Sequence, residues 1–171
     1  MKAVFFDKDG TLIKNVPYNV RPELIELKPG ARRAAQMLQA AGWKLFVVSN
    51  QSGVARGLFS ETDLSAVWRR LNELCQIEFD GFYYCPHFET GKIARYAVVC
   101  DCRKPAAGLL QQAAREHNLD LSQSWMIGDN QTDADAGRLA GCRTILLGQA
   151  NIKADFAVQD LNEASKIILS S

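Results

Sequence analysis

The sequence predicts an α/β fold of three layers, in which helices cover both faces of a doubly wound, mostly parallel sheet. Two observations lead to this fold class. Short apolar runs without polar alternation indicate strands that are buried on both faces, as in parallel sheets. Between these runs lie segments with residues that begin and end helices, an alternation typical of βαβ units. Right-handed crossovers would then bring the carboxyl ends of the strands to one edge of the sheet.

In the N-terminal half, the apolar run 4–6 is the first predicted strand, and the polar, proline-containing segment 15–28 follows as a loop. The helix 29–42 begins with proline and ends at a glycine, which suit the first helical turn and the position after a helix end. The run 43–48 is the second buried strand. The helix 60–77 opens with a serine cap and early acids, which favour a helix N-terminus.

The C-terminal half continues the alternation of strand and helix. We expect Pro105 in the first turn of a helix that reaches His117 or Asn118, and Gly141 follows the predicted helix 132–140. The remaining predicted elements are the strands 80–84, 124–127 and 143–147, a short edge strand at 155–158, and a last helix at 161–169.

Length and composition indicate an ordinary globular protein. The 171 residues fit a single domain, 1–171, with a loop insertion at about 85–102. Apolar residues make up 47% of the chain and the net charge is +1, so nothing favours binding to nucleic acid or to an anionic membrane. The sequence has neither a long apolar stretch nor a signal pattern. We therefore expect a cytoplasmic monomer that acts on a small molecule.

The first strand leads into Asp7-Lys8-Asp9-Gly10-Thr11, which places two carboxylates two positions apart. Such close acids repel each other unless a cation or a shared proton offsets their charge. A divalent metal is the expected cation. The alternative is a strand that simply ends in an Asp-Gly turn.

Three further polar clusters should meet these acids at the same edge of the sheet. They are Ser49-Asn50, Lys104 and Gly128-Asp129. Together the residue types suit phosphoryl transfer from a monoester. One carboxylate attacks phosphorus, a second acid protonates the leaving alcohol, and a metal and a lysine neutralise the equatorial oxygens. Taken singly, each cluster could be structural, as a turn hydroxyl, a solvated lysine or a loop acid.

The set closely resembles the aspartate-nucleophile phosphatases of the haloacid dehalogenase (HAD) superfamily, over nearly the whole chain. The resemblance implies a HAD-like Rossmannoid fold, with Asp7 as the nucleophile that forms an aspartyl-phosphate and Asp9 as the general acid and later base. It also implies catalytic Mg²⁺ held by the Asp7 carboxylate, the Asp9 backbone carbonyl and Asp129. Asp133 is a weaker match. The residues implied to act on the phosphate are Thr11, Ser49, Asn50, Gln51 and Lys104.

A second metal site is indicated by Cys85-Pro86-His87 and Cys100-Asp101-Cys102. Three thiols and one imidazole are a ligand set that structural zinc prefers, and four protein ligands leave no position open for catalysis. A redox dithiol at Cys100 and Cys102, or buried free thiols, are the alternatives. The pattern also resembles the zinc-loop branch of the superfamily, which acts on heptose bisphosphate and on histidinol phosphate.

The site should be open, because neither loop near the motifs is long enough for a cap domain. Its walls would be the segments 15–28 and 51–59 and the zinc loop, and they carry Arg56 and Arg103, whose planar forks suit a second, non-reacting phosphate. Alternatively, Arg56 is a solvated loop residue.

The run from Ser49 to Gly57 resembles the D-glycero-D-manno-heptose 1,7-bisphosphate 7-phosphatases, since Ser52 stands where the histidinol-phosphate branch has an acid. This resemblance implies hydrolysis of the C7 phosphate to heptose 1-phosphate for surface polysaccharide precursors. Lys8 departs from the usual arginine, and Asn130 stands where some heptose enzymes have a lysine that could contact the substrate. Alternatives are a histidinol-phosphate phosphatase, another small-phosphomonoester phosphatase, a phosphatase of nucleic-acid ends, or a zinc-stabilised binding module without activity.

Overall fold

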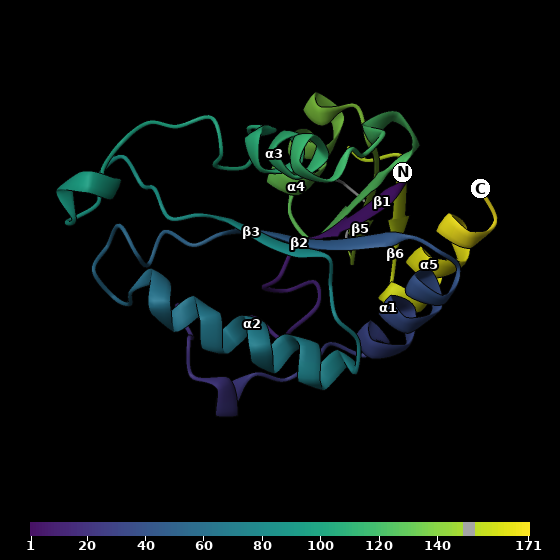
Figure 1. Ribbon diagram of the computed structural model, residues 1–171, viewed down its shortest axis with the longest axis horizontal. Coiled ribbons are helices and arrows are strands. Elements are labelled where there is room, and N and C mark those ends of the chain that lie inside the picture. The colour runs from purple at the N-terminus through teal and green to yellow at the C-terminus, as the bar shows by residue number, and fades with distance from the viewer. Residues whose placement is uncertain (149–152) are drawn as a thin grey trace.

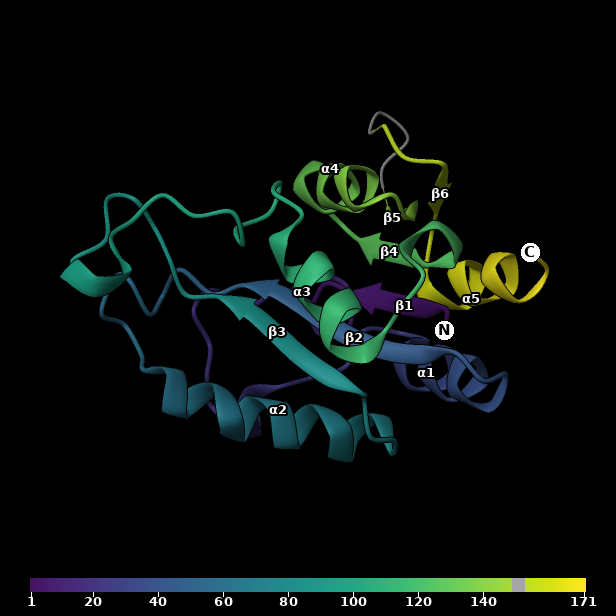
Figure 2. The same ribbon diagram turned by 45° about the horizontal axis from the view of Figure 1, so that its top comes forward.

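The computed structural model describes residues 1–148 and 153–171, and its centre is one parallel sheet (Figures 1 and 2). The strands lie in the order β3-β2-β1-β4-β5-β6, so the chain reverses direction across the sheet after β3, as in a doubly wound fold. They are β1 (Ala3–Phe6), β2 (Lys44–Asn50), β3 (Gly81–Cys85), β4 (Trp125–Gly128), β5 (Arg143–Leu147) and β6 (Phe156–Val158).

Helices cover both faces of the sheet and confirm the predicted three layers (Figure 1). Figure 1 shows α1, α2 and α5 below the sheet and α3 and α4 above it. The helices are α1 (Ala31–Ala40), α2 (Glu61–Cys75), α3 (Gly108–His117), α4 (Gln131–Ala140) and α5 (Leu161–Leu169), with short 3-10 turns at Pro22–Leu24, Ala94–Tyr96 and Leu121–Gln123.

The apolar strands fill two cores because successive side chains of a strand point to opposite faces. Val4 and Phe6 belong to the core beneath α1, α2 and α5, whereas Phe5 belongs to the core beneath α3 and α4. There Phe5 stacks on Phe46 of β2, with ring centroids 5.5 Å apart. The absence of polar alternation, from which the strands were predicted, therefore reflects burial on both sides.

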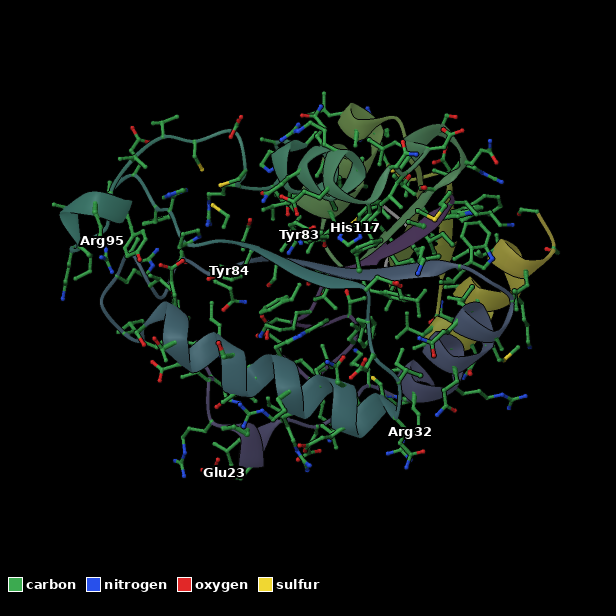
Figure 3. All side chains as sticks on the ribbon, viewed as in Figure 1. Glu23, Arg32, Tyr83, Tyr84, Arg95 and His117 are labelled. Carbon is green, nitrogen blue, oxygen red and sulfur yellow. The ribbon has the colours of Figure 1, made fainter. Side chains whose placement is uncertain are left out.

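The edge strand β3 shows the same division (Figure 3). The hydroxyl of Tyr83 lies 3.1 Å from Nε2 of His117 at the end of α3. On the other face, the hydroxyl of Tyr84 donates a 3.0 Å hydrogen bond to Glu61 at the start of α2. The edge strand β3 thus contacts helices of both layers.

The register of the strands brings their carboxyl ends together. Phe6 pairs with Val47 on one side and with Ile127 on the other, so the residues that follow β1, β2 and β4 share one edge. On β2, Asn50 pairs with Cys85 at the end of β3, which places the predicted zinc loop beside the second motif.

The predicted start of the third helix is wrong. That helix, α3, begins at Gly108 rather than at Pro105. The preceding residues form a turn, in which the Ala106 N–H donates to the Arg103 carbonyl at 2.8 Å and the Gly108 N–H donates to the Asp101 carbonyl at 3.0 Å. Because of this turn, Lys104 lies outside the helix, and its side chain reaches the carboxyl edge of the sheet. The other predicted elements are confirmed, with ends shifted by a few residues.

The connections that follow β1 and β2 at the carboxyl edge of the sheet contain no cap domain, in agreement with an open site. Between β1 and α1 the regular structure is limited to the 3-10 turn Pro22–Leu24 and to isolated β-bridges of Ile13 with Asp9 and Leu27, and the connection from β2 to α2 contains no helix. Within residues 1–148 and 153–171, no helix has both the length and the apolar character needed to traverse a bilayer.

Candidate active site

The centre of the site is a buried ion pair between the first and third motifs. Asp7 follows β1, and its backbone N–H donates to the carbonyl of Ile127 on β4 at 2.8 Å. Nζ of Lys104 lies 2.5 Å from Oδ1 of Asp7 and 2.7 Å from Oδ1 of Asp133, and it donates to the Val48 carbonyl at 2.9 Å. Lys104 is only 3% exposed, so its charge is balanced almost entirely by these partners.

Asn50 holds the backbone of that lysine. Its Nδ2 donates to the Lys104 carbonyl at 3.0 Å, and its Oδ1 accepts from the Lys104 N–H at 3.0 Å. This two-point contact fixes the turn before α3 against the end of β2. The sequence predicts a substrate contact for Asn50, and in the structure its amide engages the protein backbone.

Three carboxylates form a cluster that could hold a cation. Oxygen atoms of Asp7, Asp129 and Asp133 all lie within 4.8 Å of one another. Burial outweighs the charge of Lys104 and raises the pKa of Asp7 to about 7, and burial also raises the pKa of Asp129. Crowded, desolvated acids gain stability from a divalent cation, and oxygen ligands suit Mg²⁺.

Asp133 connects this cluster to the N-terminus of α4. Its Oδ2 accepts hydrogen bonds from the N–H groups of Asn130 at 3.1 Å and of Asp129 at 3.3 Å. Its Oδ1 pairs with Lys104. The sequence predicts a minor role for Asp133, whereas the structure gives it a share in both the helix cap and the central ion pair.

Two glycines make room for the acids. A Cβ at Gly10, whose φ is +88°, would lie 2.1 Å from Oδ2 of Asp129. A Cβ at Gly128 would lie 2.3 Å from Cβ of Asp133. Both distances are far below van der Waals contact, so the motif backbones approach the carboxylates as closely as only glycine allows.

Asp9 lies beside Asp7 and is held from two sides. Nζ of Lys8 donates to its Oδ1 at 2.7 Å, and Nε2 of Gln51 donates to its Oδ2 at 3.2 Å. The same Nε2 lies 2.7 Å from Oγ of Ser49. The sequence indicates no role for Lys8, yet this lysine is 1% exposed and its charge faces the Asp9 carboxylate. Its place between Asp7 and Asp9 in the first motif is the one feature of the sequence that could have indicated this contact.

Two adjoining cavities open at this edge of the sheet. The smaller, of about 180 Å³, lies over the acids, Lys104, Ser49 and Asn130. The larger, of about 270 Å³, extends over Lys8, Gln51 and the aromatic side chains of Tyr18 and Phe59. Both are lined by Asp9, Asn15 and Asn50, so a ligand over the acids could continue into the larger cavity. The lining residues Asn15, Tyr18, Asn19 and Phe59 come from loops and were missed from the sequence, whereas Asn50 and Asn130 were predicted.

The predicted arginines Arg56 and Arg103 line neither of these two cavities, and among the residues predicted to act on the reacting phosphate Thr11 also lines neither. Its side chain is fully buried, and within the described parts of the chain its Oγ1 has no hydrogen-bond partner. The hydroxyl lies in the turn after Gly10, and the prediction that it contacts phosphate stays a prediction.

The two predicted arginines meet at one aromatic ring. The guanidinium carbon of Arg56 lies 4.0 Å from the ring centroid of Phe88, and that of Arg103 lies 5.2 Å from it. Arg56 also lies over Tyr18, at 5.9 Å, and Tyr18 lines the larger cavity. The structure therefore brings both arginines together at one phenylalanine for which the sequence carries no signal, and their contact with a second phosphate stays a prediction.

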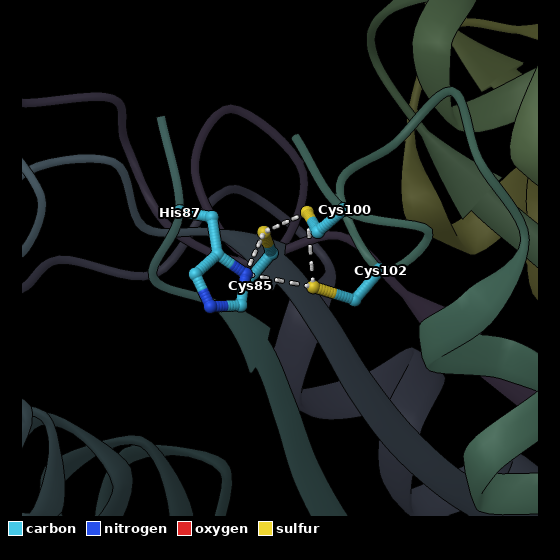
Figure 4. A group of neighbouring side chains, drawn as sticks. All are labelled: Cys85, His87, Cys100 and Cys102. Atoms are coloured by element: carbon cyan, nitrogen blue, oxygen red, sulfur yellow. Dashed lines mark hydrogen bonds between the residues drawn. The ribbon is translucent and has the colours of Figure 1, made fainter. Parts of the chain in front are cut away.

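The predicted zinc ligands converge (Figure 4). Sγ of Cys85 lies 3.5 Å from Sγ of Cys100 and 3.7 Å from Nδ1 of His87, and Sγ of Cys102 lies 3.3 Å from each of the other two atoms. A tetrahedral zinc with bonds of about 2.0–2.3 Å would separate its ligands by roughly 3.5–3.8 Å. The four atoms thus fit a single zinc ion, whereas a dithiol would need only two of them.

Backbone hydrogen bonds tie this loop to the second motif. The Gln51 N–H donates to the Cys85 carbonyl at 2.8 Å, and the Ala55 N–H donates to the Pro86 carbonyl at 3.2 Å. Further out, the Ile93 N–H donates to the Ala55 carbonyl at 2.9 Å. The loop of the cysteine and histidine cluster therefore supports the loop that carries Arg56 as well as the turn that carries Lys104.

Comparisons with known proteins point to one group of enzymes. A family model described as HAD-hydrolase-like matches residues 101–165. The chain is 42% identical over 150 residues to the D-glycero-beta-D-manno-heptose-1,7-bisphosphate 7-phosphatase of Haemophilus ducreyi, with 85% of this chain and 82% of the relative covered. It is 43% identical over 152 residues to the D-glycero-D-manno-heptose-1,7-bisphosphate 7-phosphatase of Thermosynechococcus vestitus, with 85% and 78% covered.

The solved structures agree with the sequence comparison. One similar structure is the crystal structure of D,D-heptose 1,7-bisphosphate phosphatase from B. bronchiseptica complexed with magnesium and phosphate. It is 29% identical to this chain, with a TM-score of 0.85 and 99% of each chain covered. The likeness thus extends over the whole fold and not only over the motifs.

Proposed function

This chain belongs to the heptose 1,7-bisphosphate 7-phosphatase family of HAD-like hydrolases, and from this membership we propose that it hydrolyses the C7 phosphate of D-glycero-D-manno-heptose 1,7-bisphosphate to heptose 1-phosphate. The observation that carries the proposal is the buried Asp7–Lys104 pair within a carboxylate cluster, beneath a cavity that adjoins a larger one lined by Tyr18, over which Arg56 lies. This arrangement suits one reacting phosphate and one that is only bound.

The chain's own residues would divide the reaction between them. Asp7 attacks phosphorus and forms an aspartyl-phosphate, and Asp9 donates a proton to the leaving sugar oxygen and later removes one from the attacking water. Lys104 neutralises oxygens of the transferred group and orients Asp7. Lys8 and Gln51 hold the Asp9 carboxylate in place beside the nucleophile.

Magnesium fits the acidic cluster. Asp7 and Asp129, with the backbone carbonyl of Asp9, would hold the ion, and Asp133 adds negative charge beside it. Bound there, the ion would supply charge stabilisation for the transferred phosphoryl group. The relative from B. bronchiseptica, determined with magnesium and phosphate, supports this proposal.

Magnesium binding is expected to strengthen as the pH rises from about 6 to about 8. Because burial raises the pKa of Asp7 to about 7, its carboxyl keeps a proton below that pH and must lose it to bind a cation. Calorimetric titration with Mg²⁺ across this range, in the absence of substrate, measures the affinity. An affinity that is independent of pH, or that falls as the pH rises, would contradict the assignment of Asp7 as a ligand.

Zinc is proposed for the Cys85, His87, Cys100 and Cys102 cluster, as a structural ion. We expect the purified protein to contain roughly one zinc per chain and the Cys102→Ser variant to retain much less. Elemental analysis measures the content. The control is Cys75→Ala, which removes a buried thiol outside the cluster and should leave the zinc content unchanged. Zinc-free protein with a Cys100–Cys102 disulfide would instead support the redox alternative.

The substrate is tested by steady-state phosphate release. Heptose 1,7-bisphosphate, offered as each anomer at C1, is compared with histidinol phosphate and with an aryl phosphate. The proposal requires the highest kcat/KM on a heptose bisphosphate, and faster turnover of histidinol phosphate would overturn it. Asn130 lines the reacting cavity, and the anomer panel also shows whether an asparagine there tolerates both configurations.

We further propose that residues 1–171 form one catalytic domain, active as a monomer in the cytoplasm, with no nucleic-acid or membrane partner. The near-neutral charge supports the absence of an anionic polymer as partner. The product would be used for surface polysaccharide precursors, in lipopolysaccharide or capsule.

A further inference from the structure

Phe88 lies where three loops of the site meet. It follows the zinc ligand His87, and its ring carries Arg56 from the loop after β2 at 4.0 Å and Arg103 from the turn before α3 at 5.2 Å. From the loop after β1, Tyr18 approaches the same guanidinium of Arg56 at 5.9 Å. One ring thus contacts both arginines for which the proposed function needs a common position.

The contacts matter because little else fixes these guanidinium groups. Arg103 donates one long hydrogen bond, of 3.4 Å, to the His87 carbonyl. Nε of Arg56 is buried, and within residues 1–148 and 153–171 it has no hydrogen-bond partner. Neither arginine forms an ion pair with a described carboxylate. The face of an aromatic ring attracts a guanidinium and leaves its N–H donors free for another acceptor.

Two positive groups held on one ring repel each other unless an anion lies between or beside them. Their planar forks are suited to the oxygens of a phosphate. An anion bound to the cluster of Arg56, Phe88 and Arg103 would therefore offset the repulsion between the two guanidinium groups. The reacting phosphate is already served by Lys104 and the acids, so a second phosphate of the substrate is the fitting anion.

We propose that Phe88 is a positioning residue that holds Arg56 and Arg103 as one site for the non-reacting phosphate of a sugar bisphosphate. The inference rests on the proposed function, since it assigns that phosphate to this cluster. Phe88 acts through the arginines and does not touch the reacting atoms. Its position next to His87 means that the zinc loop sets where the ring stands, and through the ring, where both charges stand.

The test compares a bisphosphate with an aryl phosphate that has no second phosphate. Removing the ring in Phe88→Leu should lower the ratio of kcat/KM for heptose 1,7-bisphosphate to that for the aryl phosphate by about tenfold, through KM. Phe88→Tyr keeps the face of the ring and should therefore retain the wild-type ratio. Val99→Ala, an exposed side chain of the same loop, is the control for general disturbance of the loop.

Zinc content separates positioning from loop damage. If Phe88→Leu loses zinc, the comparison is repeated with Phe88→Met, whose longer, unbranched side chain reaches further along the space of the ring and has no aromatic face. An unchanged ratio in a zinc-loaded variant would overturn the proposal. So would loss of zinc in both variants, because Phe88 would then act on the loop and not on the arginines.

The outcome can be separated from failure of the proposed function. If the wild type released no phosphate from heptose bisphosphate but hydrolysed the aryl phosphate, that function would fail. Phe88 would then be judged by competitive inhibition of aryl phosphate turnover, with fructose 1,6-bisphosphate compared with fructose 6-phosphate. Stronger inhibition by the bisphosphate that disappears in Phe88→Leu would support the site, and equal inhibition of the wild type by both sugars would overturn it.

Discussion

Asp7→Asn is expected to slow phosphate release by about 10⁴-fold or more, for the heptose bisphosphate and for an aryl phosphate alike. The amide has the shape of the carboxylate but cannot form the covalent intermediate. The loss should appear in kcat, because the arginines and the larger cavity are unchanged. Steady-state phosphate release at saturating Mg²⁺ measures it.

Folding of this variant can be checked independently. Burial disfavours the ionised form of Asp7, so the wild type gives up stability as the pH rises from the unfolded pKa of about 4 to the folded pKa of about 7. Without metal, Asp7→Asn should therefore lack this pH-dependent loss, as thermal unfolding scans at several pH values would show. Lys104 keeps Asp133 as its partner. If a well-folded Asp7→Asn protein retained more than about a hundredth of the wild-type rate, the aspartyl route would be excluded.

Lys104→Met is expected to have the largest effect on stability. Methionine resembles the stem of lysine in volume, but Asp7 and Asp133 would be left buried without the charge that both contact. Breaking a buried pair in this way costs about 3–5 kcal/mol, and the loss of charge at the transferred phosphoryl group should lower kcat by about 10³-fold. Urea unfolding and phosphate release measure the two effects.

The pH dependence of the Lys104→Met loss identifies its cause. The destabilisation should be full at about pH 8 and should shrink as the pH falls, because the stranded carboxyls can then take up protons. Lys14→Met is the matched control, since Lys14 forms an exposed pair with Glu26 and should contribute little. If Lys104→Met were as stable as the control at pH 8, the charges of Asp7 and Asp133 would be solvated by water without the lysine, and the buried pair would not contribute to stability.

The strands and the order of the site residues along the chain could be predicted from the sequence, because both follow from regular patterns of residues. Strands buried on both faces have no alternation, so residues 4–6 and 43–48 could be recognised, and parallel crossovers then placed Asp7, Ser49 and Asp129 at one edge. The cysteine and histidine pattern gave a cluster that the structure brings together.

What could not be predicted are contacts made by irregular backbone. Proline suits the first turn of a helix, so Pro105 was placed there, but the turn that presents Lys104 displaced the helix to Gly108. The roles of Lys8 and Phe88 depend on which carboxylate and which arginines happen to lie opposite them. Local sequence carries no signal for such pairs, since a buried lysine and a surface lysine look alike in a loop.

The space left by the missing side chains of Gly10 and Gly128 bears on how this protein tolerates change. At both positions even a methyl group would overlap a carboxylate side chain of the site. A survey of all single substitutions would therefore rank these two glycines with the acids among the most intolerant positions, although neither has a side chain to contribute to chemistry. Intolerance to substitution at these two positions therefore reflects how closely the backbone approaches the carboxylates, and it is not evidence that the glycines take part in the chemistry.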